Sequence, residues 1–580
     1  MALRQVVMLL LVGICAALGM GTASVVQTCK KDTDTFLWEI NQDKPKQYAV
    51  DMYDAFGKMG SNIEGGNANQ PGLLQQCRSA HGPSFSGQYC QVFLRQGKVE
   101  YFVGICVPDS CAEEEVQQMV LQNKLQMDRM SLIPPLPSIL VNDSTQEMFM
   151  THCLSNTVYP DASDITCLSV FFPNLLVDSG ATSTCWSQSC WNGFLQAFSL
   201  QNTSRNVLSM SSHIPGGGFS SVNGIRVLSL LWIICGHSAQ FPVINNLDNY
   251  KNWKATVENS PFYVLSISGP VFLAVDTFLL LGGMLSSRSL LILLLINSEI
   301  FSVWWFVLMM LFYTCRIQPL HLFIMCLTIG LISLVQWGPY WFPFINTLMD
   351  CKTYWWANLF LISNLLPVHE ICIPWTWYLS LDFQCYATTP VLVFFYRLTS
   401  EKYVLYYYVK PYTRYSPFLI GILIGIYLTT RKDQLLKSKW QAALGWFGAL
   451  AVMAVVVGVA YILKDTPAYV SVPHSLYQGL HRPLWALSVA WIILACEEGY
   501  GGFIKEFLSM NVWVPLSNIS FACYLIHPVF IILYIGLQDT PIHFTNINFM
   551  YLFLGHLVLT LVVSYVLNIE RVLNAPEPRP

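Results

Sequence analysis

The chain has 580 residues, of which 54% are hydrophobic and only 11% are charged, whereas a soluble domain usually carries about 25% charged residues. This composition excludes an ordinary soluble globular protein, and the net charge of −3 argues against a nucleic-acid partner. Apolar runs of about 20 residues, the length a helix needs to cross a bilayer, follow one another through residues 225–568.

The first 24 residues have the pattern of a signal peptide. Arg4 precedes an apolar core, VVMLLLVGICAALGM, and the small residues GTAS follow it. Such a leader is removed and places the following segment in the lumen or outside the cell. The alternative interpretation is a first transmembrane anchor, but the short apolar core favours the signal peptide.

Residues 25–190 predict a cysteine-rich lumenal domain, small and mostly helical, with a linker over residues 191–222. Behind a signal peptide, cysteines at this density indicate a disulfide framework whose pairing the sequence leaves open. A zinc site at CVPDSC (106–111) is the alternative, although no histidine cluster or second C-x-x-C motif supports it. Asn142 and Asn202 begin glycosylation sequons. The nine cysteines, an odd number, are Cys29, Cys77, Cys90, Cys106, Cys111, Cys153, Cys167, Cys185 and Cys190.

Residues 223–570 predict an all-α polytopic membrane bundle of about ten transmembrane helices, and residues 571–580 form a C-terminal tail. The third candidate span contains Asn297, Ser298 and Glu299, so an interfacial helix is the alternative there. The candidate spans are 225–243, 262–285, 290–313, 319–337, 375–397, 416–430, 441–463, 484–500, 520–536 and 548–568.

Basic residues in short loops predict the orientation of this bundle. Arg431, Lys432, Lys437 and Lys439 lie between two spans, which places their loop in the cytoplasm. Counting spans forward then places residues 501–519 and the C-terminus in the cytoplasm. Counting backward places residues 398–415 in the lumen, which conflicts with the basic residues in and beside this segment, Arg397, Lys402, Lys410 and Arg414.

The densest group of membrane-embedded polar residues lies in NGIRVLSLLWIICGHSAQ (223–240). Arg226 and His237 are eleven residues apart, which is close to three helical turns and about 16 Å along one side of a helix. Histidine can take a proton from a hydroxyl, and arginine suits a phosphate or a carboxylate. In the alternative interpretation His237 bonds a backbone carbonyl at a helix end, and Arg226 extends its charge to the membrane surface.

Further ionisable or aromatic groups follow within or beside the later spans, where such residues indicate function or interfacial anchoring. They occur in VDTFLLLGGML (275–285), CRIQP (315–319), CIPWTWYLSLDFQ (372–384), KPYTR (410–414) and ACYLIHP (522–528). The candidate supporting residues in these motifs are Asp276, Arg316, Trp377, Tyr378, Asp382, Gln384, Arg414 and His527.

Taken in this order, the motifs resemble those of the acyltransferase 3 family, and the cysteine-rich domain in front resembles its nose-resistant-to-fluoxetine branch. The resemblance implies a membrane-bound acyltransferase that moves an acyl group from acyl-CoA, as a co-substrate with no bound cofactor, to a hydroxyl of a lipid or small-molecule acceptor. His237 would then be the general base, and Arg226 would hold the donor's phosphates or orient the histidine. The bundle would lie in the endoplasmic reticulum or the plasma membrane.

The chain departs from this family pattern in its number of spans. Relatives have one more span before the helix of His237 and another between residues 397 and 410, where only a short segment connects the helices here. Our hypothesis is that this chain lacks two helices of the family fold, which leaves its activity in question. A lipid or small-molecule transporter that uses the same fold without catalysis is the alternative function, since buried charges also serve transport.

Overall fold

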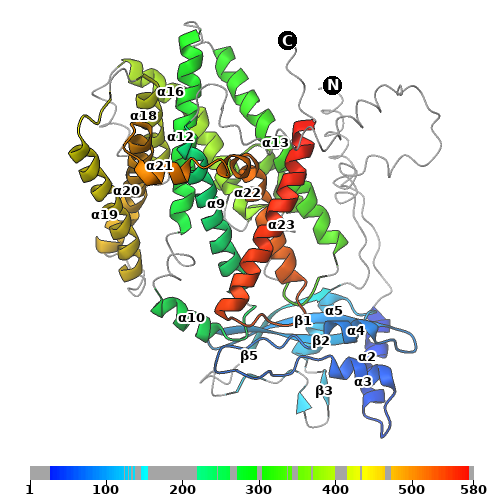
Figure 1. The fold of residues 1–580 in the computed structure, drawn as a ribbon. Helices are drawn as coiled ribbons and strands as arrows, with labels where there is room; N and C mark the ends of the chain where they lie inside the picture. Colours follow the sequence, from blue (N-terminus) through cyan, green and yellow to red (C-terminus); the bar gives the residue numbers. More distant parts are fainter. Residues whose placement is uncertain are drawn as a thin grey trace, which may run out of the picture. The chain divides into compact units, whose positions relative to one another are not determined.

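The computed structural model describes residues 26–122, 146–154, 219–243, 246–260, 271–296, 303–335, 337–341, 351–366, 370–398, 415–430, 434–463 and 472–573, with short pieces between residues 124 and 137. The chain forms two compact units, Met1–Thr157 and Val158–Pro580 (Figure 1). The predicted signal peptide, residues 191–218 of the predicted linker, both sequons and Arg414 lie outside the described residues.

The first unit is built around a three-stranded antiparallel sheet in the order β2-β1-β5. Gly97 has a φ of +60° and begins the two-residue turn between β1 and β2, a turn type that requires positive φ. The sheet corrects the prediction of a mostly helical domain. The elements are α2 (Val26–Ile40), α3 (Gln47–Asp54), α4 (Leu74–Ser79), β1 (Gly87–Gln96), β2 (Val99–Pro108), α5 (Glu113–Leu121), β3 (Gln126–Met127), β4 (Met130–Ser131) and β5 (Gln146–Leu154).

Three disulfides connect the helices and strands of this unit, which confirms the predicted disulfide framework. Cys29–Cys111 joins α2 to the segment before α5, Cys77–Cys106 joins α4 to β2, and Cys90–Cys153 joins β1 to β5. Removal of a native disulfide from a small secreted domain typically costs about 2–5 kcal/mol. Cys167, Cys185 and Cys190 lie outside the part of the chain that the structure describes.

The Glu113 carboxylate links α5 to the edge strand β5. It accepts hydrogen bonds from the backbone N–H of Cys153 at 3.1 Å and from His152 Nδ1 at 3.4 Å. Burial raises the pKa of the Glu113 carboxyl, but the bonds from His152 and Cys153 outweigh burial, so the net pKa is lowered from its usual 4.5. A lowered pKa means that the carboxylate stabilises the folded domain above about pH 4.5 and that this contribution is lost as the pH falls below it.

We therefore expect Glu113→Gln to loosen the attachment of α5 to β5 at neutral pH and to weaken the acid sensitivity of the domain. Limited proteolysis of the full chain at about pH 7 and about pH 4 measures both effects. The exposed neighbour Glu114 provides the control Glu114→Gln, which should behave as wild type. Equal proteolysis of both variants would contradict the prediction.

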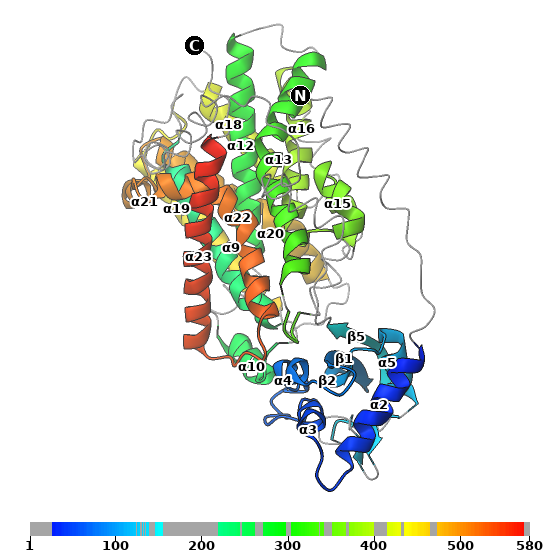
Figure 2. The same cartoon turned by 90° about the vertical axis from the view of Figure 1, so that its right-hand side faces the viewer.

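The second unit is a helical bundle (Figures 1 and 2). In the described ranges, six helical segments are long and apolar enough to cross a membrane, and two more apolar segments, Ile317–Gly330 and Ser416–Thr430, are shorter. The helices are α9 (Ser221–Gln240), α10 (Tyr250–Asn259), α12 (Val271–Ile296), α13 (Val303–Leu334), α15 (Cys351–Leu359), α16 (Trp377–Leu398), α18 (Ser416–Thr430), α19 (Lys439–Leu463), α20 (Val472–Glu497), α21 (Gly502–Leu508), α22 (Trp513–Gly536) and α23 (Asn546–Leu573).

The multi-pass architecture is confirmed, whereas the count of about ten spans is not. The predicted spans 290–313 and 319–337 are not two separate helices. Residues 290–296 belong to α12, and Val303–Leu334 is one helix of 32 residues. Pro319 lies inside this helix and does not end it, because neighbouring groups in a membrane can satisfy the carbonyl that proline leaves without a partner.

Glycines bring α12 and α18 into close backbone contact, as the small residues in both segments predict. A Cβ atom at Gly421 would lie 2.1 Å from the Leu280 carbonyl oxygen, and one at Gly283 would lie 2.1 Å from the Phe418 carbonyl oxygen. We therefore expect Gly421→Ala to force the helices apart and to destabilise the bundle by about 1–3 kcal/mol, the usual cost of overpacking.

The control for this substitution is Gly448→Ala in α19, where an added Cβ meets no atom within 4 Å. Because alanine favours helix by up to about 1 kcal/mol over glycine, this variant should be neutral or slightly stabilised. Thermal unfolding of both variants in detergent, followed by size-exclusion chromatography, measures the difference. Equal stability would show that the two helices are not in close contact.

The helices α16 and α18 run in the same direction. On α16, Tyr378 contacts Phe278 of α12, and Asp382 lies beside Gly282 one turn further along α12. On α18, Gly421 meets Leu280 and Gly425 meets Met284. Both helices are therefore parallel to α12, although only 17 residues lie between them in the sequence. This direction supports the hypothesis that one crossing of the family fold is absent here.

Two segments that the charge pattern predicts to be cytoplasmic lie close together at one end of the bundle. Glu498, after α20, accepts hydrogen bonds from the Leu435 and Leu436 backbone N–H groups of the α18–α19 loop, at 3.0 and 2.7 Å. The hydroxyls of Ser220, before α9, and Ser509, after α21, lie 2.9 Å apart. The described part of the α18–α19 loop and the residues around α21 therefore belong to one end of the bundle, together with the start of α9.

Candidate active site

Two parallel helices, α9 and α22, carry the polar residues at the centre of the candidate site. Arg226 donates a hydrogen bond to the Ser517 hydroxyl at 3.2 Å, and His237 Nδ1 lies 2.9 Å from His527 Nε2. Arg226 and His237 are eleven residues apart on α9, and their partners on α22 are ten residues apart. The two pairs therefore lie at nearly equal heights along the two parallel helices. The structure thus brings together two histidines that the sequence presents as separate motifs.

The hydrogen bonds of His527 define its tautomer. Its Nδ1 lies 2.9 Å from the Cys523 carbonyl oxygen, which can only accept, so this nitrogen carries the proton. In the neutral ring, Nε2 then has the lone pair and accepts a hydrogen bond from Nδ1–H of His237. It follows that Nε2 of His237 is unprotonated and is the nitrogen that can take a proton from a substrate.

The geometry of the two rings agrees with this hydrogen bond. The ring centroids lie 5.2 Å apart and the ring planes differ by 10°, while the two nitrogens are 2.9 Å apart. The rings therefore meet edge to edge in nearly one plane. Phe241 stacks on His237 at 5.2 Å, and His527 is fully buried, so packing restricts both rings.

A short segment before α16 forms the next wall of the site. Trp375 Nε1 donates to the Leu525 carbonyl at 3.2 Å, and the Tyr524 hydroxyl donates to the Trp375 carbonyl. Leu525 lies halfway along α22 (Trp513–Gly536), so the short 3-10 helix Pro374–Thr376 and the irregular backbone before it reach the middle of the bundle. Such backbone is tolerated at membrane depth only where protein satisfies its polar groups, and the bonds to α22 do so here.

A disulfide holds the start of this segment. Cys351, the first residue of α15, is bonded to Cys372, three residues before Trp375. Disulfides form in oxidising compartments, so this pairing fits a lumenal position of the loop between the two cysteines. The disulfide and the two hydrogen bonds to α22 together hold the segment in place next to Tyr524 and His527.

Aromatic rings connect α16 to the histidine pair. Tyr378 contacts Tyr524 at a centroid distance of 5.6 Å, and Tyr524 contacts His527 at 6.3 Å. Tyr378 also lies within electrostatic range of Asp382 and Arg226, and it meets the ring of Trp377 at 6.3 Å. Three of the predicted supporting residues, Tyr378, Asp382 and His527, therefore surround the Arg226–His237 face.

Other predicted site residues belong elsewhere. Gln384 exchanges two hydrogen bonds with the Asn364 side chain at 2.8 and 3.0 Å. Asp276 Oδ2 lies 3.9 Å from Nε of Arg482 on α20, in an ion pair whose side chains are 0% and 13% exposed. Arg316 falls in α13, but its side chain lies outside the described part of the chain.

The structure adds three polar residues that the sequence analysis did not select. Arg482 pairs with Asp276, Ser517 accepts from Arg226, and His556 of α23 lies 3.3 Å from the Ser238 hydroxyl, next to His237. His556 lies within the predicted span 548–568 and Arg482 lies two residues before the span 484–500, so the signal that selected Asp276 could have identified them. Within the described ranges, no group of three or more histidine, cysteine or acidic side chains is placed to hold a metal ion.

Comparisons with known proteins show the family of this chain. Residues 219–569 match the model of the acyltransferase domain, and residues 29–120 match the N-terminal domain of nose resistant-to-fluoxetine proteins. The chain belongs to the acyltransferase 3 family. Within this family the cysteine-rich unit assigns it to the nose-resistant-to-fluoxetine branch.

One relative is the nose resistant to fluoxetine protein 6 of Caenorhabditis elegans. It is 24% identical over 652 aligned positions, which cover 91% of this chain and 78% of the relative. The alignment is longer than this acyltransferase 3 chain of 580 residues, so the relative carries segments that have no counterpart here. No solved structure matches the chain.

Proposed function

We propose that this acyltransferase 3 protein moves an acyl group from acyl-CoA to a hydroxyl of a lipid or small-molecule acceptor, with His237 as the general base. The observation that supports this role most directly is the hydrogen bond between His237 Nδ1 and His527 Nε2. It leaves the other nitrogen of His237 with a lone pair in a polar site inside an apolar bundle. A histidine held in one tautomer by a second group has the arrangement that general-base catalysis requires.

In the proposed reaction, Nε2 of His237 takes the proton from the acceptor hydroxyl. The acceptor oxygen then attacks the thioester carbon, the carbon–sulfur bond breaks, and the proton passes from His237 to the departing CoA thiolate. His527 is a positioning residue, because it acts on the substrate only through His237. The products are an ester of the acceptor and free CoA.

For Arg226 we propose contact with an anionic group of the donor. It lies about 16 Å along α9 from His237 and bonds Ser517 instead, so it is too distant to orient the histidine. A guanidinium near the end of a helix suits a phosphate. Its position near the start of α9, at the end of the bundle with the predicted cytoplasmic loops, supports the CoA phosphates as that group.

The experiment that tests the proposal measures label transfer in membranes that contain the full chain. Membranes receive a panel of labelled acyl-CoAs, and the product is examined for an alkali-labile ester and an equivalent release of CoA. Transfer above that of membranes without the chain is the expected result. No transfer from a chain that is folded by size-exclusion chromatography would overturn the enzyme and favour the transport alternative.

A further inference from the structure

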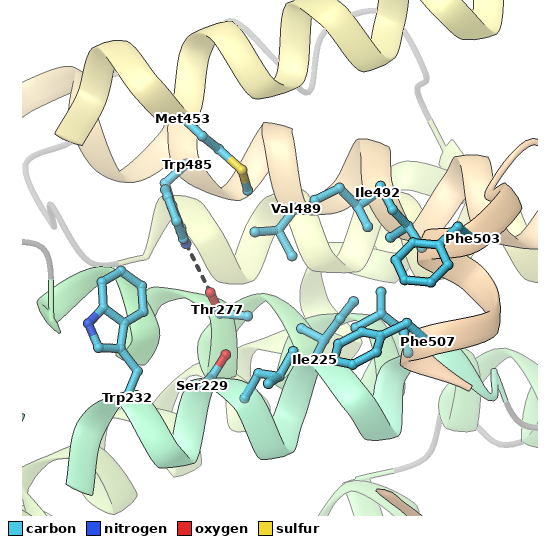
Figure 3. Close-up of a pocket in the computed structure, with 13 residues that line it drawn as sticks. Ile225, Ser229, Trp232, Thr277, Met453, Trp485, Val489, Ile492, Phe503 and Phe507 are labelled. Atoms are coloured by element: carbon cyan, nitrogen blue, oxygen red, sulfur yellow. Dashed lines mark hydrogen bonds between the residues drawn. The ribbon is translucent and has the colours of Figure 1, made fainter. Parts of the chain in front are cut away.

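A cavity of about 360 Å³ lies between α9, α12, α19, α20 and α21 (Figure 3). Trp232, Thr277 and Trp485 lie at one end of it, and Phe503 and Phe507 of α21 lie at the other. Ligand sites in proteins range from about 300 to 1,000 Å³, so this cavity has room for part of a ligand rather than for a whole acyl-CoA.

The lining of the cavity suits an apolar occupant. Only two hydroxyl side chains contribute to it, those of Ser229 and Thr277, and no charged residue does. The Thr277 hydroxyl accepts a hydrogen bond from Trp485 Nε1 at 2.9 Å and donates to the Leu273 carbonyl at 3.1 Å. A polar group of a ligand would lose its hydration here without gaining partners, which is unfavourable. An alkyl chain has no such cost.

The cavity shares helix α9 with the candidate active site. Trp232 lies five residues before His237, about 7.5 Å along the helix axis, while Ile225 lines the cavity next to Arg226. The tryptophan end is therefore the end nearer His237. A chain whose carbonyl carbon is near His237 would run from there toward α21, at the end of the bundle where the predicted cytoplasmic loops gather.

We propose that this cavity binds the alkyl chain of the acyl donor, so that the substrate class is a long-chain fatty acyl group rather than acetyl. The identity of the occupant rests on the proposed acyl transfer. Residues of five helices line the cavity. The lining residue nearest its centre is Val489 of α20, between Trp485 and Ile492. A larger side chain at this position fills the volume that the alkyl chain would take.

The test uses a long-chain fatty acyl-CoA with a diazirine near the end of its chain, added to membranes containing the full protein. After irradiation, mass spectrometry locates the labelled residues, and an excess of the unlabelled acyl-CoA of the same chain length serves as a competitor that should remove the label. Labels on Met453, Ile492, Phe503 or Phe507 are the expected result. Labels confined to other helices, or equal labelling by a phospholipid that carries the same diazirine chain, would overturn the proposal.

Two variants on one helix sharpen this result. Val489→Phe should lower the labelling about tenfold or more, in line with the cost of misfit in an apolar site, and shift any transfer toward shorter chains. Leu487→Phe adds the same side chain at a position that is 51% exposed and does not line the cavity, so labelling should be unchanged. If Val489→Phe does not fold, Ser229→Phe on α9 takes its place. The positions of the labels in the wild type test the proposal whether or not these variants fold.

The variant His237→Ala separates this inference from the proposed function. It should keep the label in the cavity, because His237 does not line it. If the wild type is labelled in the cavity but transfers no acyl group, the alkyl-binding site is supported and the proposed acyltransferase activity is rejected. If the wild type transfers an acyl group but is labelled only outside the cavity, the activity is supported and the alkyl-binding site is rejected.

Discussion

Acyl transfer should fall by about 10²–10⁴-fold when His237 is replaced by alanine, which is the usual contribution of a general base. The loss should appear in kcat, because His237 takes its proton as the acceptor oxygen attacks, while the apparent affinity for acyl-CoA changes little. The measurement is the rate of ester formation in membranes at equal amounts of folded protein.

The matched control is His321→Ala. His321 is also a buried histidine of the bundle, on α13, and it lies 3.2 Å from the Gln318 side chain, away from the histidine pair. This variant should keep most of the activity. If acyl transfer is unchanged in His237→Ala, or falls equally in His321→Ala, His237 is not the general base.

The role of His527 is tested by a pair of variants at that position. His527→Ala deprives Nδ1–H of His237 of its acceptor, so that the tautomer of His237 is no longer fixed. His527→Gln offers a side-chain oxygen that can accept the same bond and should restore part of the rate. A residue with a merely structural role would show no such rescue by glutamine at equal folded amounts.

Breaking the Asp276–Arg482 pair should cause the largest loss of stability, about 3–5 kcal/mol, because the substitution leaves one buried charge without its partner. Asp276 is fully buried and Arg482 is 13% exposed. Asp276→Leu alone should therefore destabilise the purified protein strongly in thermal unfolding. The double variant Asp276→Leu with Arg482→Met should recover much of the loss, since a well-packed apolar pair often replaces a buried ion pair at little cost.

An exposed pair in the same chain provides the control. Arg95 and Glu100 form an ion pair whose side chains are 51% and 58% exposed, and such pairs contribute about 0–1 kcal/mol. Arg95→Met should thus change stability little. If Asp276→Leu proves as mild as Arg95→Met, the two buried charges do not depend on each other.

The candidate site was predictable where one helix carries its signal. Arg226 and His237 stand on one face of α9 because their spacing is close to three turns, and this follows from helical geometry alone. His527 and Tyr378 were selected as polar residues in or beside apolar runs. Their meeting with His237 was not predictable from spacing, because it depends on how α9, α16 and α22 pack over more than a hundred residues of sequence.

The parts that sequence reasoning missed have physical reasons too. Strands β1 and β2 are buried on both faces, so they lack the alternation that identifies a half-buried strand. The count of spans was wrong around residues 290–337, because hydropathy measures the length of an apolar run and not the place where a helix ends. The position of Trp375 halfway along α22 depends on the Cys351–Cys372 disulfide and on hydrogen bonds to α22, which no local pattern encodes.

The histidine pair also has a consequence for how the protein is made. His237 and His527 are 290 residues apart in sequence, and a ribosome adds roughly 5–20 residues per second, so about 15 to 60 seconds separate the synthesis of the two. Throughout that interval α9 is present without the partner of its histidine. A chain that terminates before α22 would keep Arg226 and His237 with neither Ser517 nor His527, and the cell's membrane quality control would meet α9 as a helix with polar groups still to be buried.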